Sequence, residues 1–394
     1  MAYAATRELV PLYGLYALLF EDRGLSTGSI SLLFVLWSVV AFVTEVPSGA
    51  WADTVSRRGL LLCSGALFTA TFTIWMLWPT VWGFATGFVL WGVSESLKSG
   101  TFEALLYDEL AALGAERRYA AVTGYANAGE MVCVFVAILS AAPLFELGGY
   151  ALVGWLSVAI TIANAALVLT LPSAPRVMDA DEVDGTRDTL LARYVGALRE
   201  GTTEVRTDKV VRRAVILAAA LLAGLAFDEY FGLLAREGGA SIEQVPVLVA
   251  LTVVGQVIGA ATAGRTASMS GRVMGAVVMA GAVLLAVGAL AVGALAGGVG
   301  GFVAIGLGYG ALHNTAVVAE ARLQDTMSGR TRATVTSVVG LTSEILSVGV
   351  FAGFAVGSTW IPLSGLVVAT VLPLLVVGLV AGRWLPTRGC SASS

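Results

Sequence analysis

Charged residues are scarce in this sequence, and so are the residues that metal sites most often use. Only 13% of the 394 residues are Asp, Glu, Lys or Arg, about half the share found in soluble domains. Histidine occurs once, and the three cysteines, Cys63, Cys133 and Cys390, form no Cys-x-x-Cys pair. Neither a metal site nor a disulfide framework is therefore supported.

Enzyme motifs are also missing. The sequence has no Gly-x-Ser-x-Gly, His-Glu-x-x-His or phosphate-binding P-loop pattern, which argues against hydrolytic and ATP-driven chemistry. The net charge is −4 and no basic block is present, so nucleic acid is not expected as a partner. We expect no enzyme activity, no cofactor and no bound metal.

What the sequence does contain is apolar. Hydrophobic residues make up 57% of the chain, and there are 47 glycines, which let membrane helices approach closely. A helix needs about 20 mostly apolar residues to cross a bilayer. Such stretches predict an all-α membrane protein with about twelve transmembrane helices, near 4–20, 29–52, 59–78, 82–107, 118–142, 148–171, 211–235, 243–264, 272–292, 297–323, 333–357 and 361–383.

The spans fall into two groups of six. We expect an N-terminal six-helix bundle at 1–171, a cytoplasmic linker at 172–210 and a C-terminal six-helix bundle at 211–394. In the linker, apolar residues recur at helical spacing between Leu190 and Leu198, which predicts a short amphipathic helix.

Arginine and lysine set the expected orientation, because cytoplasmic loops carry an excess of both. With the N-terminus in the cytoplasm, only Arg23 and Arg236 of the 23 basic residues fall in outer loops, and Arg7 and Lys98 fall within spans. All others lie in cytoplasmic loops and bordering helix ends, the linker or the C-terminal tail. Both termini are therefore predicted to be cytoplasmic.

The loop after the second span reads GAWADTVSRR. It resembles the loop signature of the major facilitator superfamily, in which a Gly-x-x-x-Asp pattern is followed by a basic pair. Ser56 replaces the second glycine of that signature. The stretches EVPSGAWAD and SGTFEALLYDEL further resemble a bacterial branch whose members are mostly described as exporters. The residues that match the loop signature are Gly49, Asp53, Arg57 and Arg58.

This resemblance implies a secondary transporter with two pseudo-symmetric six-helix bundles that works by alternating access. A degenerate copy of the signature in the second half, from Gly264 through Ser268 to Arg272, supports a duplicated arrangement. The placement of charged residues independently supports the resemblance, because the interiors of the third, sixth, ninth and twelfth spans contain no charged residue. In this superfamily those four helices support the ones that line the cavity.

The resemblance also implies a cytoplasmic gate. Asp53 can approach the start of the eleventh helix, where free backbone N–H groups attract an anion, and Arg57 can bridge Asp53 to Asp108. The alternative is that these are loop charges that set topology without gating.

Several charged or titratable residues lie within the spans, where a charge costs at least about 2.5–3.5 kcal/mol and needs a cavity or a partner. Glu95 and Lys98 lie three residues apart on one helix face, either neutralising each other or forming a polar floor for substrate or proton. Glu130 and Glu344 take similar places in the two halves and suit reversible protonation, or are protonated and hydrogen-bonded. The full set of candidates for proton coupling or substrate binding is Glu130, Glu344, Glu95, Lys98, Glu45, Asp228, Glu229 and His313.

Aromatic residues in the same helices either form cavity walls or pack helices together. Together with the scattered acids, they favour an apolar or amphipathic substrate, with a cation included, over a sugar. The fifth helix ends in SAAPLFELGG, a loose match to an antiporter signature that slightly favours export. The candidate cavity aromatics are Tyr13, Tyr16, Trp37, Trp91, Tyr125, Tyr230 and Tyr309.

The leading hypothesis is a proton-coupled exporter of the bacterial cytoplasmic (inner) membrane, monomeric, with a small-molecule substrate, protons and membrane lipid as its partners. A proton-coupled uptake symporter on the same fold is the alternative. A membrane receptor or lipid-modifying protein is a third, disfavoured by the missing catalytic motifs.

Overall fold

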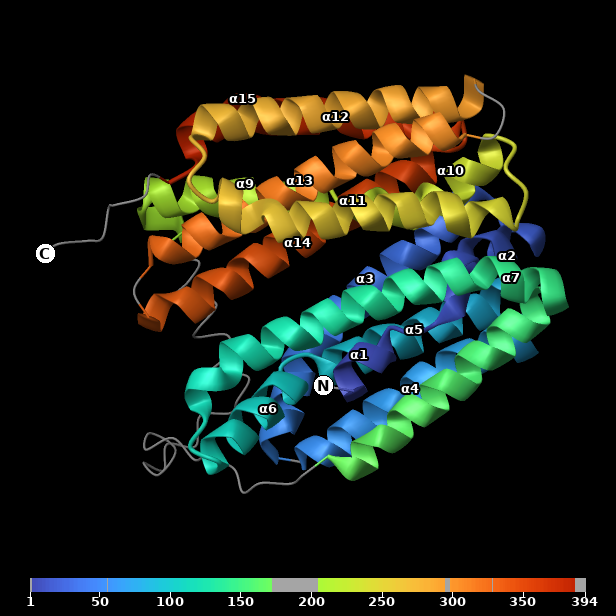
Figure 1. Cartoon of the computed structure of the whole chain (residues 1–394), viewed down its shortest axis with the longest axis horizontal. Helices are drawn as coiled ribbons and strands as arrows, with labels where there is room; N and C mark the ends of the chain where they lie inside the picture. The colour runs from blue at the N-terminus through green and yellow to red at the C-terminus, as the bar shows by residue number, and fades with distance from the viewer. Residues whose placement is uncertain (1, 55, 172–204, 295–297, 328, 387–394) are drawn as a thin grey trace, which may run out of the picture. The chain divides into compact units, whose positions relative to one another are not determined.

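The computed structural model of the chain is helical, with no strand among the residues that it describes (Figure 1). These are residues 2–54, 56–171, 205–294, 298–327 and 329–386, with side chains described except at 46–54, 293–294 and 329–334. The predicted amphipathic helix of the linker lies outside them. The chain forms two compact units. One comprises Met1–Arg23 and Leu36–Val195, and the other comprises Gly24–Val35 and Gly196–Ser394.

The first unit is built from the N-terminal half of the chain. Helix α3 begins in the second unit, where the Tyr230 hydroxyl donates to Ser31 Oγ at 2.8 Å. In chain order the elements are α1 (Ala2–Arg7), η1 (Pro11–Gly14), α2 (Tyr16–Asp22), α3 (Thr27–Thr54), α4 (Arg57–Leu77), α5 (Val81–Lys98), α6 (Thr101–Ala112), η2 (Glu116–Arg118), α7 (Tyr119–Leu167) and η3 (Val168–Thr170).

The second unit follows the linker. Its elements are α9 (Lys209–Ala223), η5 (Ala226–Tyr230), α10 (Phe231–Glu237), α11 (Gln244–Thr266), α12 (Gly271–Ala294), α13 (Val299–Asp325), α14 (Gly329–Gly357) and α15 (Leu363–Trp384).

The first membrane segment is interrupted, which corrects the continuous span expected near 4–20. Pro11 opens the short η1 helix, and Val10 before it is extended, because proline disfavours the helical conformation of the preceding residue. The Leu12 N–H donates to Ser157 Oγ at 3.0 Å, and Asn164 Nδ2 donates to the Tyr3 carbonyl oxygen at 2.8 Å. Side chains of α7 thus satisfy backbone groups in this broken segment, as a membrane interior requires.

The fourth and seventh spans are interrupted as well. Instead of one helix over 82–107, α5 ends at Lys98 and α6 begins at Thr101, because Gly100 adopts the left-handed conformation with φ 67°. Instead of one helix over 211–235, α9 ends near Gly224 and continues through η5 into α10. Both breaks lie beside candidate site residues.

Helix α7 is a hairpin of two membrane segments. Gly148 and Gly149 have non-helical conformations within it, with Gly149 at φ 59° and ψ −161°. The chain folds back at this point, and its two arms run in opposite directions (Figure 1). The arms correspond to the fifth and sixth predicted spans.

Nine described helices are long and apolar enough to cross a membrane. One of them, Glu116–Thr170, contains the α7 hairpin and so holds two crossings. With the broken first segment and the 18-residue α5, these account for the twelve predicted membrane segments. The fold class predicted from the sequence is confirmed.

In the second unit, α13 packs against both α11 and α12. Glycines allow this approach, because a Cβ at Gly255 would overlap the Gly306 carbonyl and one at Gly259 would overlap that of Gly310. In the last turn of α13, the buried Arg322 donates to the carbonyl oxygens of residues in the α11–α12 loop and after α15. These acceptors are Ala267 at 2.9 Å, Met269 at 3.1 Å and Pro386 at 3.0 Å.

Candidate functional site

Five charged side chains of the first unit lie together inside its helices, and we call them the charged cluster. Arg7 ends α1 and Glu8 follows it in the break before η1. Glu95 and Lys98 lie in the last turn of α5, and Glu130 lies in the first arm of α7. The breaks after α1 and α5 therefore bring charge from three membrane segments to one place.

Arg7 is hydrogen-bonded to one carboxylate, and its Nε lies 3.9 Å from a second, Glu8 Oε1. Its Nη2 donates to Glu95 Oε1 at 2.8 Å and to Ser94 Oγ at 2.9 Å. Its side chain is 0% exposed, and the guanidinium carbon lies 4.5 Å from the centre of the Phe68 ring. A charge-assisted hydrogen bond combined with a cation–π contact holds this arginine firmly in place.

Lys98 is shared between two carboxylates. Its Nζ lies 3.6 Å from Glu8 Oε1 and 3.7 Å from Glu130 Oε1, longer than hydrogen bonds. The Tyr13 hydroxyl donates to the other Glu8 oxygen at 3.0 Å. Glu95 and Lys98 were expected to neutralise each other or to form a polar floor. Each has ion-pair partners on other segments, and the role of the two residues as a polar floor stays a prediction.

The cluster carries three acids and two bases, so its formal charge is −1 when every member is ionised. Its acids are partly open to solvent, with 27% of the Glu130 side chain exposed. Such a site can hold an extra proton or another cation without an additional counter-ion. Among the described residues, no group of three His, Cys, Asp or Glu is placed to bind a metal ion.

Aromatic rings border the cluster in the first unit. Tyr13 stacks on Trp91, with ring centres 5.5 Å apart and planes at 9°, and the half-buried Trp37 lies 5.3 Å from Trp91. Tyr16 is buried against the same tryptophan. Tyr125 instead is 72% exposed. Tyr13 and Trp37 are therefore the rings of this group best placed to face a ligand.

Two of the residues expected to form a gate, Arg57 and Asp108, form an ion pair. Arg57 at the start of α4 donates to Asp108 on α6, and Arg58 donates to the Leu169 carbonyl oxygen. The Asp53 side chain and the surroundings of Gly49 lie outside those described, so the expected contact of Asp53 with the eleventh helix stays a prediction. Nearby, the Ser99 hydroxyl donates to the exposed Glu45 at 3.0 Å.

The second unit holds a separate acidic position. The Tyr309 hydroxyl, from α13, donates to Asp228 Oδ2 in η5 at 2.9 Å. Asp228 is exposed and Glu229 half-buried, whereas Tyr230 and Tyr309 are buried and pack within the unit. A buried ring can orient an acid but cannot form an open wall.

Two further candidates lie elsewhere in the second unit. His313 is half-buried on α13, and its Nδ1 has no hydrogen-bond partner among the described residues. Glu344 is half-buried on α14.

The arrangement of helices and the family comparison now agree. Residues 3–350 match the Major Facilitator Superfamily. The chain belongs to this superfamily. Among curated protein sequences, none matches the chain. As a major facilitator protein it is a multi-pass integral membrane transporter.

Solved transporter structures share the fold of this superfamily member at low identity. A mutant of the nucleoside transporter NupG aligns with a TM-score of 0.76 at 12% identity, covering 96% of this chain and 97% of that one. A bacterial homologue of the human lysosomal transporter Spinster gives 0.71 at 13%, covering 97% and 94%. A bacterial homologue of the iron transporter ferroportin gives 0.68 at 15%, covering 97% and 95%. Such identities support the fold alone.

The candidate set from the sequence left out three contributors to the cluster. Arg7 and Glu8 were recognised as charges inside the first span, but their partners on other helices were not predicted. Ser94 supports Arg7, and its hydroxyl also donates to the Ser64 carbonyl oxygen at 2.8 Å. Serine is common in apolar helices, so no sequence signal distinguishes it.

Proposed function

We propose that this major facilitator protein is a secondary active transporter that exports a small apolar or amphipathic molecule in exchange for protons. The observation that carries the proposal is the sharing of Lys98 between Glu8 and Glu130 in the charged cluster. Alternating access would open this cluster to each side of the membrane in turn.

Glu130 is the carboxylate that we assign to proton coupling. Glu95 receives a hydrogen bond from Arg7 at 2.8 Å. Protonation of Glu95 would remove the close counter-ion of the buried Arg7 and leave it only Glu8, at 3.9 Å. Glu130 lies 3.7 Å from Lys98, so it gives up only a loose contact when it takes a proton. Lys98 then keeps Glu8, and its charge stays compensated.

The same argument favours a cationic substrate. Loss of a proton from Glu130 leaves the cluster with a formal charge of −1, and a cation can take the proton's place. Tyr13 and Trp37 offer aromatic faces beside the acids, and such faces attract desolvated cations. Competition between proton and cation at one carboxyl gives exchange without a second binding site. In the second unit, Asp228 with Tyr309, Glu229, His313 and Glu344 are the further candidates.

The Arg57–Asp108 ion pair supports a role for the loop after the second span in the cytoplasmic gate, with Asp53 and Gly49 as its other members.

The direction of transport rests on a weaker observation. The Gly148-Gly149 pair of the antiporter-like stretch is required by the α7 turn, so only Ala142-Pro143 and the exporter-like stretches favour export. We place the protein in the bacterial inner membrane, as a monomer with both termini in the cytoplasm and with the domain boundaries at 171 and 210.

Transport of the lipophilic cation tetraphenylphosphonium into inverted and right-side-out vesicles tests the proposal. An acid-inside gradient should drive uptake into inverted vesicles containing the wild type. Glu130→Gln should abolish this gradient-driven uptake, and binding of the cation to purified protein should no longer release protons. Glu146→Gln, on the exposed outer end of the same α7 arm, is the matched control and should behave as wild type.

Two outcomes would contradict the proposal. Uptake that requires an acid outside and right-side-out vesicles would favour the symporter alternative. Unchanged proton release in Glu130→Gln would move coupling to another carboxylate, with Glu45 or Asp228 tested next.

A further inference from the structure

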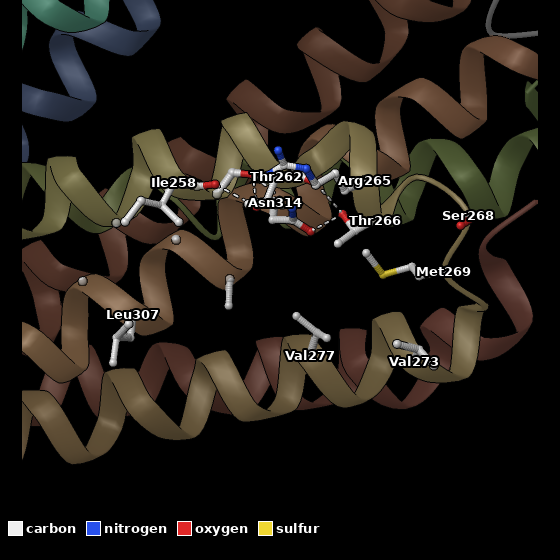
Figure 2. A pocket seen from close by; sticks show the side chains of 15 residues that line it. Ile258, Thr262, Arg265, Thr266, Ser268, Met269, Val273, Val277, Leu307 and Asn314 are labelled. Atoms are coloured by element: carbon white, nitrogen blue, oxygen red, sulfur yellow. Dashed lines mark hydrogen bonds between the residues drawn. The ribbon is translucent and has the colours of Figure 1, made fainter.

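An apolar groove opens on the second unit, and none of the residues that line it belongs to the charged cluster. Its volume is about 400 Å³, within the range of small-ligand pockets. It lies where α11 and α12 both pack on α13, and Figure 2 shows Ile258 of α11 on one wall and Val273 and Val277 of α12 on the other. Ile258, Val273 and Leu307 are exposed, so the groove has an open apolar rim.

The length of the groove matches one leaflet of a bilayer. It extends along α11 from Gly255 to Arg265, a rise of about 15 Å at 1.5 Å per residue. The hydrocarbon core of a membrane is about 30 Å thick. The groove therefore runs from the end of α11 to about the middle of the membrane, as a lipid acyl chain does.

Polar groups in the wall already satisfy one another. Asn314 Nδ2 donates to the Gly259 carbonyl oxygen at 3.0 Å and to Thr262 Oγ1 at 3.1 Å, and its oxygen accepts from Thr266 Oγ1 at 3.0 Å (Figure 2). This wall needs no polar ligand, so its remaining surface suits a hydrocarbon chain.

Charge is confined to one end of the groove. Arg265 is the one charged residue among the described residues that line it, and Ser268 lies in the adjoining loop. Arg265 is exposed and has no ion-pair partner within the described part of the chain. An arginine in the last turn of a membrane helix attracts the phosphate of an anionic lipid and repels a cationic substrate.

We propose that this groove binds one anionic phospholipid. An acyl chain lies along Ile258, Val277 and Leu307, and the phosphate contacts Arg265 and Ser268. On the predicted topology, the lipid belongs to the cytoplasmic leaflet. The inference does not depend on the transport cycle proposed above.

Native mass spectrometry of the full-length protein tests this site. The probe is a nanodisc with equal amounts of phosphatidylglycerol and phosphatidylethanolamine, from which the protein is released in mild detergent. Wild type should retain phosphatidylglycerol over phosphatidylethanolamine by about fivefold, the preference that one arginine near an anionic surface supplies. Arg265→Gln should abolish the preference. Arg383→Gln, a matched loss of an exposed arginine that does not line the groove, should keep it.

A second pair of variants tests the chain-binding wall. Val277→Phe fills the groove and should remove the retained lipid, whereas Val287→Phe, at an exposed position of α12 outside the groove, should not. Absence of lipid preference in wild type would overturn the proposal. So would equal retention by Arg265→Gln and Arg383→Gln, or by Val277→Phe and Val287→Phe in monodisperse protein.

Discussion

The two bases of the charged cluster each lie within 4 Å of two acids, but they differ in how closely they contact them. Arg7 has a hydrogen-bonded carboxylate, Glu95, and a buried ring beneath it. Lys98 lies at similar distances from two acids and is hydrogen-bonded to neither. The first arrangement resists change because an unpaired buried charge is costly. The second permits exchange, because Lys98 keeps one counter-ion whichever acid is neutral.

The Arg57–Asp108 pair gives a prediction at the same scale. Asp108→Asn leaves Arg57 without its anion, and an unmatched buried group costs about 1–3 kcal/mol. If the pair stabilises one state of the cycle, its loss should shift the balance between states by roughly 5- to 150-fold and slow transport accordingly. Turnover in vesicles measures the effect.

Two further variants make the gate test specific. The exchange Arg57→Asp with Asp108→Arg should recover part of the lost turnover, whereas Glu116→Gln, at an exposed position, should change little. Wild-type turnover in Asp108→Asn would show that this pair is not part of the gate.

Asp53→Asn should impair transport in folded protein if the expected contact with the eleventh helix exists.

At the scale of elements, the interruptions of the helices position the chemistry. The breaks at Pro11 and Gly100 place Glu8 and Lys98 beside segment ends, and the break after α9 carries Asp228 in η5. A regular helix would direct its backbone groups along its own axis and leave less room for a neighbouring charge. Side chains such as Ser157 and Asn164 satisfy backbone groups of the broken first segment.

The α7 hairpin gives a prediction about stability. Gly149 has φ 59° and ψ −161°, a region that is essentially restricted to glycine, so Gly149→Ala should cost about 1–3 kcal/mol. A Cβ at Gly149 or at Gly124 would meet no atom within 4 Å. Gly124→Ala, in a regular turn of the same helix, therefore controls for the added methyl group.

Thermal unfolding of both variants in detergent measures the difference. Gly149→Ala should unfold at lower temperature than wild type, and Gly124→Ala should equal or exceed it because alanine favours helix. Equal midpoints for the two variants would show that the turn tolerates a side chain.

At the scale of the whole molecule, the basic residues predict the orientation of twelve membrane segments. In a background with Cys63, Cys133 and Cys390 replaced by serine, Ser393→Cys should react with an impermeant maleimide only after the cells are permeabilised. Ser241→Cys, exposed between α10 and α11, should react in intact cells. The reverse pattern would invert the proposed topology and the direction assigned to transport.

The sequence by itself determined the membrane class, the number of segments and the superfamily, because hydropathy and a short loop signature are local properties of the chain. It also predicted the pairing of Arg57 with Asp108 through that resemblance. Tertiary structure alone decided that Arg7 pairs with Glu95 and that Lys98 lies within ion-pair distance of both Glu8 and Glu130. These partners come from different membrane segments, and only the packing of interrupted helices brings them within a few ångströms. Spacing along one helix predicts neighbours on its face, but the nearest opposite charge belongs to whichever helix packs against it.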